Sequence, residues 1–325
     1  MRPLVSIVVC TRNRSDMLRE TMKTIRSQRY RPVEIVVVDD GSTDDTKEVL
    51  AEFGNDINYF HQDRKGIAEA RSVGCRRARG EFIAFQDDDD LMPPDRIDDL
   101  LDGMRQHPEA VLAVGDWELI DPDGRDTGKR SRFGVTSLKG EPVVIEDGYR
   151  AVLWPLVTPL PHTTLFRRSD AQRVGWFDAE RFFHACSDTD FFARLGRLGP
   201  VVYVPKIVSY YRMGHAQIWG RKLLGEYSRF LLFEKHLMSL EETDRELKAR
   251  LRQRLLAVLR QISAIGYFGG DDANGVPADY VKRGLGLLDV SGRLSYLWYR
   301  AVQFPVSRLL RSRPADTAVP DRRAT

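Results

Sequence analysis

The sequence contains little cysteine. Only Cys10, Cys75 and Cys186 are cysteines among 325 residues, and no two of them have the Cys-x-x-Cys spacing. So few and so widely spaced thiols exclude a disulfide framework and give no support to a zinc site or to thiol redox chemistry. We therefore expect a protein of a reducing compartment, the cytoplasm.

The sequence also lacks a long apolar run. No stretch approaches the roughly 18 residues that a membrane-spanning helix needs. Residues 1–4 lead straight into a short strand-like segment rather than into a signal peptide. We expect a chain that does not cross a membrane.

Neither sign of charge dominates the whole chain, but the two signs are separated along it. The formal net charge is +3, acidic residues crowd positions 39–102, and arginines are frequent after residue 290. The two ends are therefore expected to meet different partners, and no nucleic-acid partner is expected. A hydrophobic content of 42% is ample for a core.

Short apolar runs alternate with helical spacing over the first hundred residues. The predicted strands are residues 4–10, 33–38, 57–61 and 81–85, and the predicted helices are residues 15–28, a short helix carrying Val49 and Leu50, 66–78 and 93–106. This alternation predicts an α/β fold with a Rossmann-like, mainly parallel central sheet and flanking helices.

The strict alternation ends after Pro108. The second half predicts strands at 111–120, 163–167 and 201–211, a helix at 188–197, a loop at 125–140, and further helices at 223–238, 247–267 and 278–288. We therefore divide the chain into an α/β domain of residues 1–218, a helical C-terminal region of residues 219–312, and a disordered tail of residues 313–325.

Four consecutive aspartates, residues 87–90, follow the fourth predicted strand. Adjacent carboxylates repel one another, so such a run indicates a nearby cation, either a hard metal ion or an arginine or lysine. A second acidic pair, Asp39-Asp40, ends the second strand, and parallel sheets place their ligand sites at this edge. The alternative is a solvated acidic loop.

A third acidic pair, Asp188 and Asp190, lies far along the chain from the aspartate run. A carboxylate that holds a cation and one that accepts a proton need opposite environments, which this separation allows. The alternative for Asp188 is a helix N-cap.

Several motifs, in chain order, resemble those of the family-2 glycosyltransferases, which are nucleotide-sugar-dependent enzymes with the GT-A fold. The resemblance covers residues 4–215. It rests on residues 5–14, the Val-Asp-Asp-Gly-Ser element at 38–42, residues 66–71 and 80–85, the aspartate run as the DXD motif, residues 187–190 as the Glu-Asp element, and residues 210–215 as the Tyr-Arg-x-His stretch.

The resemblance implies a site for a nucleotide-diphosphate sugar and a divalent metal, Mg²⁺ or Mn²⁺. Its implied donor-binding residues are Thr11, Arg12, Asp40, Arg71 and Asp88, and its implied metal-binding residues are Asp87, Asp89 and His215. Asp90 is expected to cap the next helix or to support the metal ligands. His162 ranks lower, as a residue lining the site.

The resemblance also implies that Asp188 is the general base. It deprotonates an acceptor hydroxyl, which attacks the anomeric carbon from the face opposite the diphosphate, so the configuration inverts. The chain departs from the family at Ser187, where glutamate is usual, and at Arg12, where an aromatic residue commonly stacks on the base. A UDP- or dTDP-sugar is favoured because the Asp40 contact suits a pyrimidine.

Three other functions compete with this reading. A processive synthase needs spanning helices and a Gln-x-x-Arg-Trp motif, and a sugar nucleotidyltransferase needs a glycine-rich loop after the first strand; neither feature is present. A catalytically impaired sugar-nucleotide-binding or accessory subunit is the main alternative, because of Ser187 and Arg12.

The acceptor is expected to be a glycan, a lipid-linked saccharide or a small molecule. Residues 293–311 place apolar side chains on one helical face and arginines elsewhere. This pattern favours either a helix packed on its own domain or a peripheral contact with the inner face of the membrane.

Overall fold

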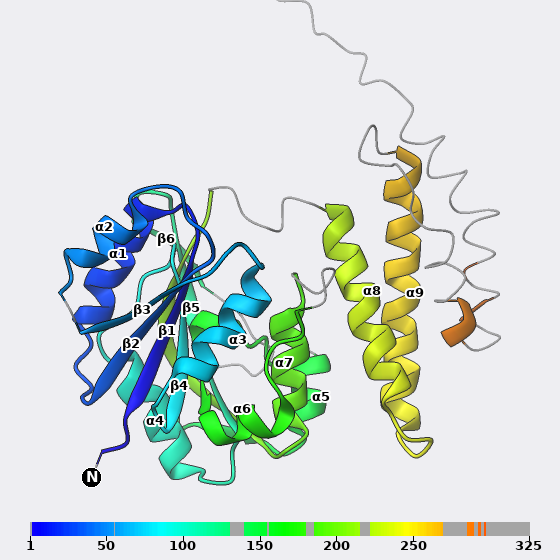
Figure 1. Ribbon diagram of the computed structural model, residues 1–325. Coiled ribbons are helices and arrows are strands. Elements are labelled where there is room, and N and C mark those ends of the chain that lie inside the picture. The colour runs from blue at the N-terminus through cyan, green and yellow to red at the C-terminus, as the bar shows by residue number, and fades with distance from the viewer. Residues whose placement is uncertain are drawn as a thin grey trace, which may run out of the picture. The chain divides into compact units, whose positions relative to one another are not determined.

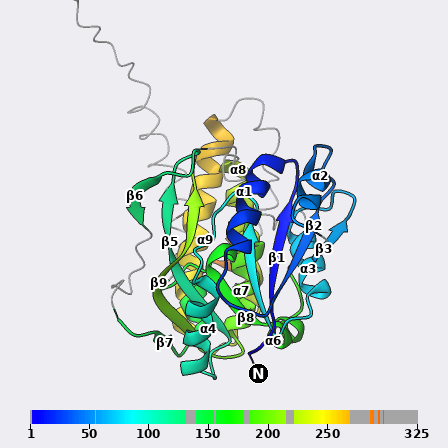
Figure 2. The ribbon, with the colours of Figure 1, turned by 90° about the vertical axis from the view of Figure 1, so that its left-hand side faces the viewer.

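The computed structural model describes residues 2–54, 56–130, 140–154, 156–179, 185–214, 222–268, 285–288, 292–293 and 296. The chain divides into two compact units, residues 1–220 and 221–325. The first unit is a central sheet with helices on both faces: α1 and α4 cover one face, and α3 and α7 cover the other (Figures 1 and 2).

The first hundred residues fold with the predicted alternation. The elements are β1 (Val5–Thr11), α1 (Ser15–Arg26), β2 (Val33–Asp39), α2 (Thr46–Ala51), β3 (Ile57–His61), α3 (Ile67–Arg77), β4 (Phe82–Asp87) and α4 (Arg96–Gln106). Every residue of β1 is buried, and α1 contributes Leu18, Met22 and Ile25 to the same core. Strands buried on both faces and helices with one apolar stripe are what a covered parallel sheet requires.

The second half contains more short elements than its sequence indicates. These are β5 (Leu112–Ile120), β6 (Asp126–Arg130), β7 (Val143–Ile145), α5 (Gly148–Leu153), the 3₁₀ helix η1 (Pro161–Thr163), β8 (Thr164–Arg167), α6 (Arg168–Val174), α7 (Ser187–Gly196) and β9 (Val201–Arg212). The prediction of a loop at 125–140 is wrong for β6, which pairs with β5. All five residues of β6 are exposed, so no apolar alternation marks it.

The strand order is β3-β2-β1-β4-β8-β5-β9-β7, with β6 beside β5. The first four strands of this order are parallel to one another. Strand β8 is antiparallel to both of its neighbours, β4 and β5, whereas β5 and β9 are again parallel. The fold is thus the expected α/β architecture, with antiparallel pairs confined to contacts of the later strands.

The second unit contains α8 (Lys222–Met238) and α9 (Arg245–Phe268) as its two long helices, within its described part. They pack on each other through buried residues such as Phe230, Leu255 and Leu259. Most of the helix predicted at 278–288, most of the arginine-rich segment 293–311 and the whole tail 313–325 lie outside the described residues. No described helix is both long enough and apolar enough to span a bilayer.

Helices α5 and α7 approach each other at two glycines. A methyl group added at Gly196 lies 2.4 Å from the backbone carbonyl of Gly148, and one added at Gly148 lies 2.4 Å from the backbone oxygen of Gly199. Real Cβ atoms do not come this close, and the opposing atoms are backbone atoms that cannot rotate away. Only glycine therefore permits this packing, which fixes the helix that carries Asp188.

We expect Gly196→Ala to lower the free energy of unfolding by about 2–3 kcal/mol, because the two helices must separate. The matched control is Gly225→Ala on α8, where the added methyl group has no atom within 4 Å. That substitution is expected to be neutral or to stabilise by up to about 1 kcal/mol through helix propensity. Urea unfolding followed by fluorescence measures both, and equal stabilities of the two variants would contradict the packing argument.

Candidate active site

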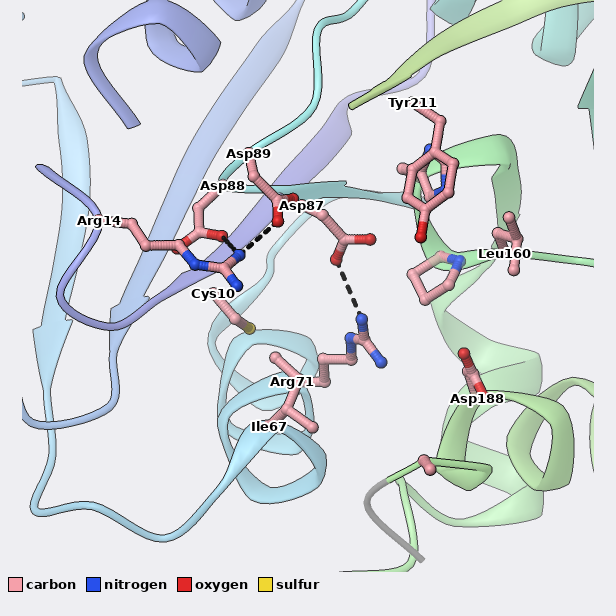
Figure 3. Close-up of a pocket in the computed structure, with 13 residues that line it drawn as sticks. Cys10, Arg14, Ile67, Arg71, Asp87, Asp88, Asp89, Leu160, Asp188 and Tyr211 are labelled. Carbon is pink, nitrogen blue, oxygen red and sulfur yellow. Dashed lines mark hydrogen bonds and ion pairs between the residues drawn. The ribbon is translucent and has the colours of Figure 1, made fainter. Parts of the chain in front are cut away.

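A cavity opens at the carboxyl ends of the first strands (Figure 3). Among the predicted site residues, Arg71, Asp87, Asp88, Asp89 and Asp188 line it. The other lining residues are Cys10, Arg14, Ile67, Leu160, Pro161, His162, Ala185 and Tyr211. Five predicted residues from three separate segments are thus brought to one cavity.

Strand register explains why the acidic segments meet. In the sheet, β1 lies between β2 and β4, with Thr11 opposite Asp39 and Cys10 opposite Asp87. The ends of β2 and β4 therefore lie at the same edge, one on each side of β1. The two acidic strand ends thus share one edge of the sheet, although Asp39 and Asp40 do not line the cavity.

Asp87 is paired with Arg71. The Nη2 atom of Arg71, on α3, lies 3.0 Å from Oδ1 of Asp87, and the Arg71 side chain is almost fully buried. Burial by itself raises the pKa of Asp87, but the surrounding positive groups, Arg71 first among them, together outweigh it and hold that pKa below its usual value. Arg71 is therefore an interior cation of the cavity and not a helix-surface arginine.

Asp88 and Asp89 share a different arginine. Nη1 of Arg14 donates to Oδ1 of Asp88 at 2.9 Å and also to Oδ2 of Asp89. Burial raises the pKa of Asp88 to about 7 despite Arg14, and the neighbouring charges of Asp89 and Asp87 add to the rise. The lining of the cavity is thus a set of mutually repelling carboxylates held by two guanidinium groups.

The prediction that Asp90 caps the next helix is wrong. The N-cap residue of α4 is Asp95, whereas Oδ1 of Asp90 accepts a hydrogen bond of 2.8 Å from the backbone N–H of Arg212. The Arg212 guanidinium in turn donates to the Asp89 carbonyl oxygen at 2.8 Å. Asp90 therefore joins the aspartate run to the end of β9.

His162 lies beside Asp90 in the wall of the cavity. Its Nδ1 is 2.7 Å from Oγ of Ser209 and 3.2 Å from Oδ2 of Asp90, and its ring stacks on Tyr211. Burial lowers the pKa of His162 to about 4, so the imidazole is neutral at pH 7. Its assignment as a residue lining the site agrees with its place in the cavity wall.

The described residues include one group with metal-ligand geometry. Potential ligand atoms of Asp87, Asp90 and His162 lie within 4.8 Å of one another. The predicted ligand His215 lies outside the described residues, and the carboxylate of Asp89 faces Arg14. The three carboxylates that line the cavity, Asp87 to Asp89, supply the hard oxygen donors that Mg²⁺ and Mn²⁺ prefer, so this lining fits such an ion.

Asp188 lies across the cavity from the aspartate run, in the first turn of α7 (Figure 3). The N-cap of α7 is Cys186, and Oδ1 of Asp188 accepts a hydrogen bond of 2.7 Å from the N–H of Thr189. Burial raises the pKa of Asp188, although Arg71 opposes the rise. A half-buried carboxylate with a raised pKa is suited to accept a proton.

The residues on either side of Asp188 in its motif, Ser187 and Asp190, are both fully buried. Asp190 is fully buried and pairs with Arg194 at 2.9 Å. Ser187, which replaces the family's glutamate, is buried, and its hydroxyl has no hydrogen-bond partner among the described residues. Ser187 therefore cannot supply the negative charge beside Asp188 that a glutamate would.

The predicted donor-binding residues Thr11, Arg12 and Asp40 do not line this cavity. Arg12 is exposed, and Thr11 is buried at the end of β1. The two carboxylate oxygens of Asp40 accept hydrogen bonds from Gln62, Lys65 and Gly66 at 2.7–2.9 Å. These residues lie at the same sheet edge, but the cavity itself does not include them.

Sequence reasoning missed the roles of Arg14 and Arg212. In the sequence both lie within motifs, and nothing in the neighbouring residues distinguishes them from surface arginines. Their partners are 74 and more residues away in the chain. The one signal in the sequence was the aspartate run itself, because adjacent carboxylates need a cation nearby.

Comparisons with known proteins place the chain in a family. The family described as "Glycosyl transferase family 2" matches residues 6–175. An uncharacterized glycosyltransferase of Rickettsia bellii is 24% identical over 226 residues, which are 68% of this chain but only 31% of that protein. The chain thus spans about a third of the length of that relative.

Solved glycosyltransferase structures share the fold. Residues 1–349 of Staphylococcus aureus TarS, in complex with UDP-GlcNAc, superpose with a TM-score of 0.66 at 18% identity, covering 94% of this chain and 89% of that one. The mannosyltransferase PcManGT of Pyrobaculum calidifontis, in complex with GDP-Man and Mn²⁺, has a TM-score of 0.57 at 18% identity, with 95% and 88% covered. The fold is that of GT-A glycosyltransferases, and the chain belongs to glycosyl transferase family 2.

Proposed function

We propose that this chain is a metal-dependent, inverting glycosyltransferase whose catalytic domain comprises residues 1–218. The observation that carries the proposal is the opposed arrangement of charge in one cavity. Asp87 to Asp89, with Arg14 and Arg71, form one side, and Asp188 faces them from α7. One side is suited to a diphosphate and a cation, and the other to an acceptor hydroxyl.

The donor is a nucleoside-diphosphate sugar, and a UDP- or dTDP-sugar is favoured. The support is the complexes of the similar structures, with UDP-GlcNAc and with GDP-Man and Mn²⁺. Arg71 supplies positive charge to the diphosphate, Asp88 contacts the donor, and Thr11, Arg12 and Asp40 bind the nucleoside at the same sheet edge. Asp40 already accepts three hydrogen bonds, which leaves about one of the four acceptor positions of a carboxylate for a base N–H.

The chain would hold the metal through Asp89 and Asp87, with His215 as a further ligand. A bound Mg²⁺ or Mn²⁺ would neutralise the negative charge that develops on the departing diphosphate. Because Mg²⁺ takes only one or two protein carboxylates, Asp88 and Asp90 remain for other roles. The hard oxygen atoms of the cavity lining support this assignment.

Asp188 is the general base. Its carboxylate takes the proton of an acceptor hydroxyl while the hydroxyl oxygen forms the new bond to the anomeric carbon, and the bond from that carbon to the diphosphate breaks with its electron pair. Attack from the side of Asp188, across the cavity from the aspartate run, inverts the configuration. The raised pKa of Asp188 supports this role.

The acceptor is a glycan, a lipid-linked saccharide or a small molecule. A lipid-linked acceptor is compatible with a peripheral membrane contact through residues 293–311. A sugar-nucleotide-binding subunit without transfer activity is the second candidate, and the uncharged Ser187 beside Asp188 is the observation that favours it.

A thermal-shift screen with UDP-, dTDP- and GDP-sugars, each with and without Mn²⁺, tests the donor assignment. Binding raises the free energy of unfolding by mass action, by about 2.7 kcal/mol when the ligand is at a hundredfold excess over Kd. We therefore expect one nucleotide family to raise the melting temperature by about 5 °C or more, and only with metal. Nucleoside monophosphates serve as controls, and equal shifts with them would contradict recognition of a diphosphate.

A further inference from the structure

Arg14 reaches the aspartate run from another part of the chain. It precedes α1 and is the N-cap residue of that helix, and its carbonyl oxygen accepts the N–H of Leu18 at 2.9 Å. Its side chain crosses to the end of β4, where one nitrogen, Nη1, donates to both Asp88 and Asp89 (Figure 3). The backbone of Arg14 is thus fixed, and its guanidinium lies on two carboxylates of the cavity.

The charges of this cavity wall are nearly balanced by the protein itself. Asp87 is paired with Arg71, and Asp88 and Asp89 are paired with Arg14. The side chain of Arg14 is 29% exposed, whereas those of Asp88 and Asp89 are 7% and 12% exposed. Of the two arginines, Arg71 is enclosed, and Arg14 has the solvent access that a movable partner needs.

Arg14 and a metal ion on Asp89 oppose each other electrostatically, although the carboxylate has acceptor positions for both. A divalent ion ligated by this carboxylate sits about 2.1 Å from its oxygen, close to the position of the guanidinium that now donates to Oδ2. Two cations about 5 Å apart repel each other by several kcal/mol at the dielectric of a protein surface. A diphosphate brings the negative charge that accommodates both cations.

We propose that Arg14 is a built-in counter-cation that competes with the metal for Asp89 and makes metal binding depend on the nucleotide diphosphate. The proposal rests on the proposed metal role of Asp89. When metal and diphosphate arrive, the guanidinium leaves Asp89 and pairs with phosphate oxygens, which it can bind in a bidentate manner. Ions without nucleotide are thereby held weakly.

Titration of the full chain with Mn²⁺ alone, followed by electron paramagnetic resonance of unbound Mn²⁺, tests the competition. We expect Arg14→Gln to bind Mn²⁺ at least about tenfold more tightly than the unsubstituted protein, because the competing cation is gone. Arg14→Lys should fall between them. The matched control is Arg19→Gln, since Arg19 is a surface arginine of α1 that pairs with Glu52; it should leave the affinity unchanged.

A second titration in saturating UDP completes the test. There the gain of Arg14→Gln should shrink or reverse, because the diphosphate now supplies the compensating charge. Equal or weaker Mn²⁺ binding by Arg14→Gln without nucleotide would overturn the proposal. Thermal unfolding with and without Mn²⁺ verifies that each variant is folded, and Mn²⁺ should stabilise Arg14→Gln more than the unsubstituted protein.

An Asp89→Asn arm separates this inference from the proposed function. If Asp89→Asn abolishes Mn²⁺ binding while Arg14→Gln has no effect, the competition is refuted and the metal role of Asp89 stands. If Asp89→Asn binds Mn²⁺ as tightly as the unsubstituted protein in the presence of UDP, the metal role itself fails, and the inference about Arg14 fails with it.

Discussion

Replacing Asp188 by asparagine is expected to reduce sugar transfer by about a thousandfold or more and to leave donor affinity within about threefold. General-base catalysis contributes about 10²- to 10⁴-fold, and the amide can no longer accept the proton. The amide oxygen can still accept the hydrogen bond from the N–H of Thr189, so the first turn of α7 should stay intact. Steady-state kinetics and calorimetric donor binding measure the two effects separately.

The pH dependence gives a second measure of the same base. Because burial raises the pKa of Asp188, the active carboxylate form is lost on acidification earlier than for an exposed aspartate. The transfer rate should therefore fall on the acidic side with a midpoint above the ordinary aspartate value, and this limb should be absent from the residual activity of Asp188→Asn.

The control for Asp188→Asn is Asp170→Asn. Asp170 is also an aspartate in the first turn of a helix, α6, where it pairs with Arg173 at 3.3 Å and does not line the cavity. Because Asp170 is buried, its substitution should lower stability through the loss of this ion pair and leave the activity of the folded protein unchanged. Full activity in Asp188→Asn would remove this residue from the role of base and favour another proton acceptor.

Replacing Asp89 by asparagine is expected to weaken metal-dependent donor binding by about a hundredfold, about 2.8 kcal/mol. The variant loses a charged oxygen ligand at a site where an ion uses only one or two carboxylates. Donor affinity measured with Mn²⁺ and with a chelator should differ strongly in the unsubstituted protein and little in the variant. Equal metal dependence in both would contradict the assignment of Asp89.

Asp90→Asn and Asp102→Asn are the comparison variants for Asp89→Asn. Asp90 accepts the N–H of Arg212 inside the protein, so its substitution should lower stability rather than metal affinity. Asp102 is an exposed residue of α4 that pairs with Arg105, and its substitution should change neither. If Asp90→Asn abolishes metal binding in a folded protein, the ligand group is Asp87, Asp90 and His162 instead.

Much of the fold was predictable because its strands and helices have clear periods. The continuous apolar run of β1 predicts a buried strand, and the helical spacing of the apolar residues of α1 predicts a helix with one buried face. Strand β6 was not predictable, because all its residues are exposed and its pairing with β5 provides the only reason for extension. The place of β8 between β4 and β5 depends on contacts distant in sequence, which periodicity does not encode.

The candidate site was predictable where charged residues directly follow a predicted strand or belong to a motif. The aspartate run was identified from its position after a strand, and Arg71 and Asp188 from motifs that resemble those of the family. The pairing of those carboxylates was not predictable, because Arg14 and Arg212 come from segments whose distance in space only the folded chain defines. Asp90 shows this most clearly, since its side chain accepts a hydrogen bond from the backbone of β9 and does not cap the following helix.

The attachment of the aspartate run to β9 has a consequence for the entropy of binding. Besides the Arg212 contacts, Leu91 and Tyr210 exchange two backbone hydrogen bonds of 3.0 Å, and the Arg212 guanidinium also donates to Pro122 and Glu20. The backbone that carries Asp89 is thus ordered before any ligand arrives. A loop that had to become ordered on binding would lose about 1–2 kcal/mol of conformational freedom per residue. Here the interaction energy of donor and metal with this wall appears in the affinity without that loss, and the amide of Arg212 should exchange its hydrogen slowly although it lies close to the cavity.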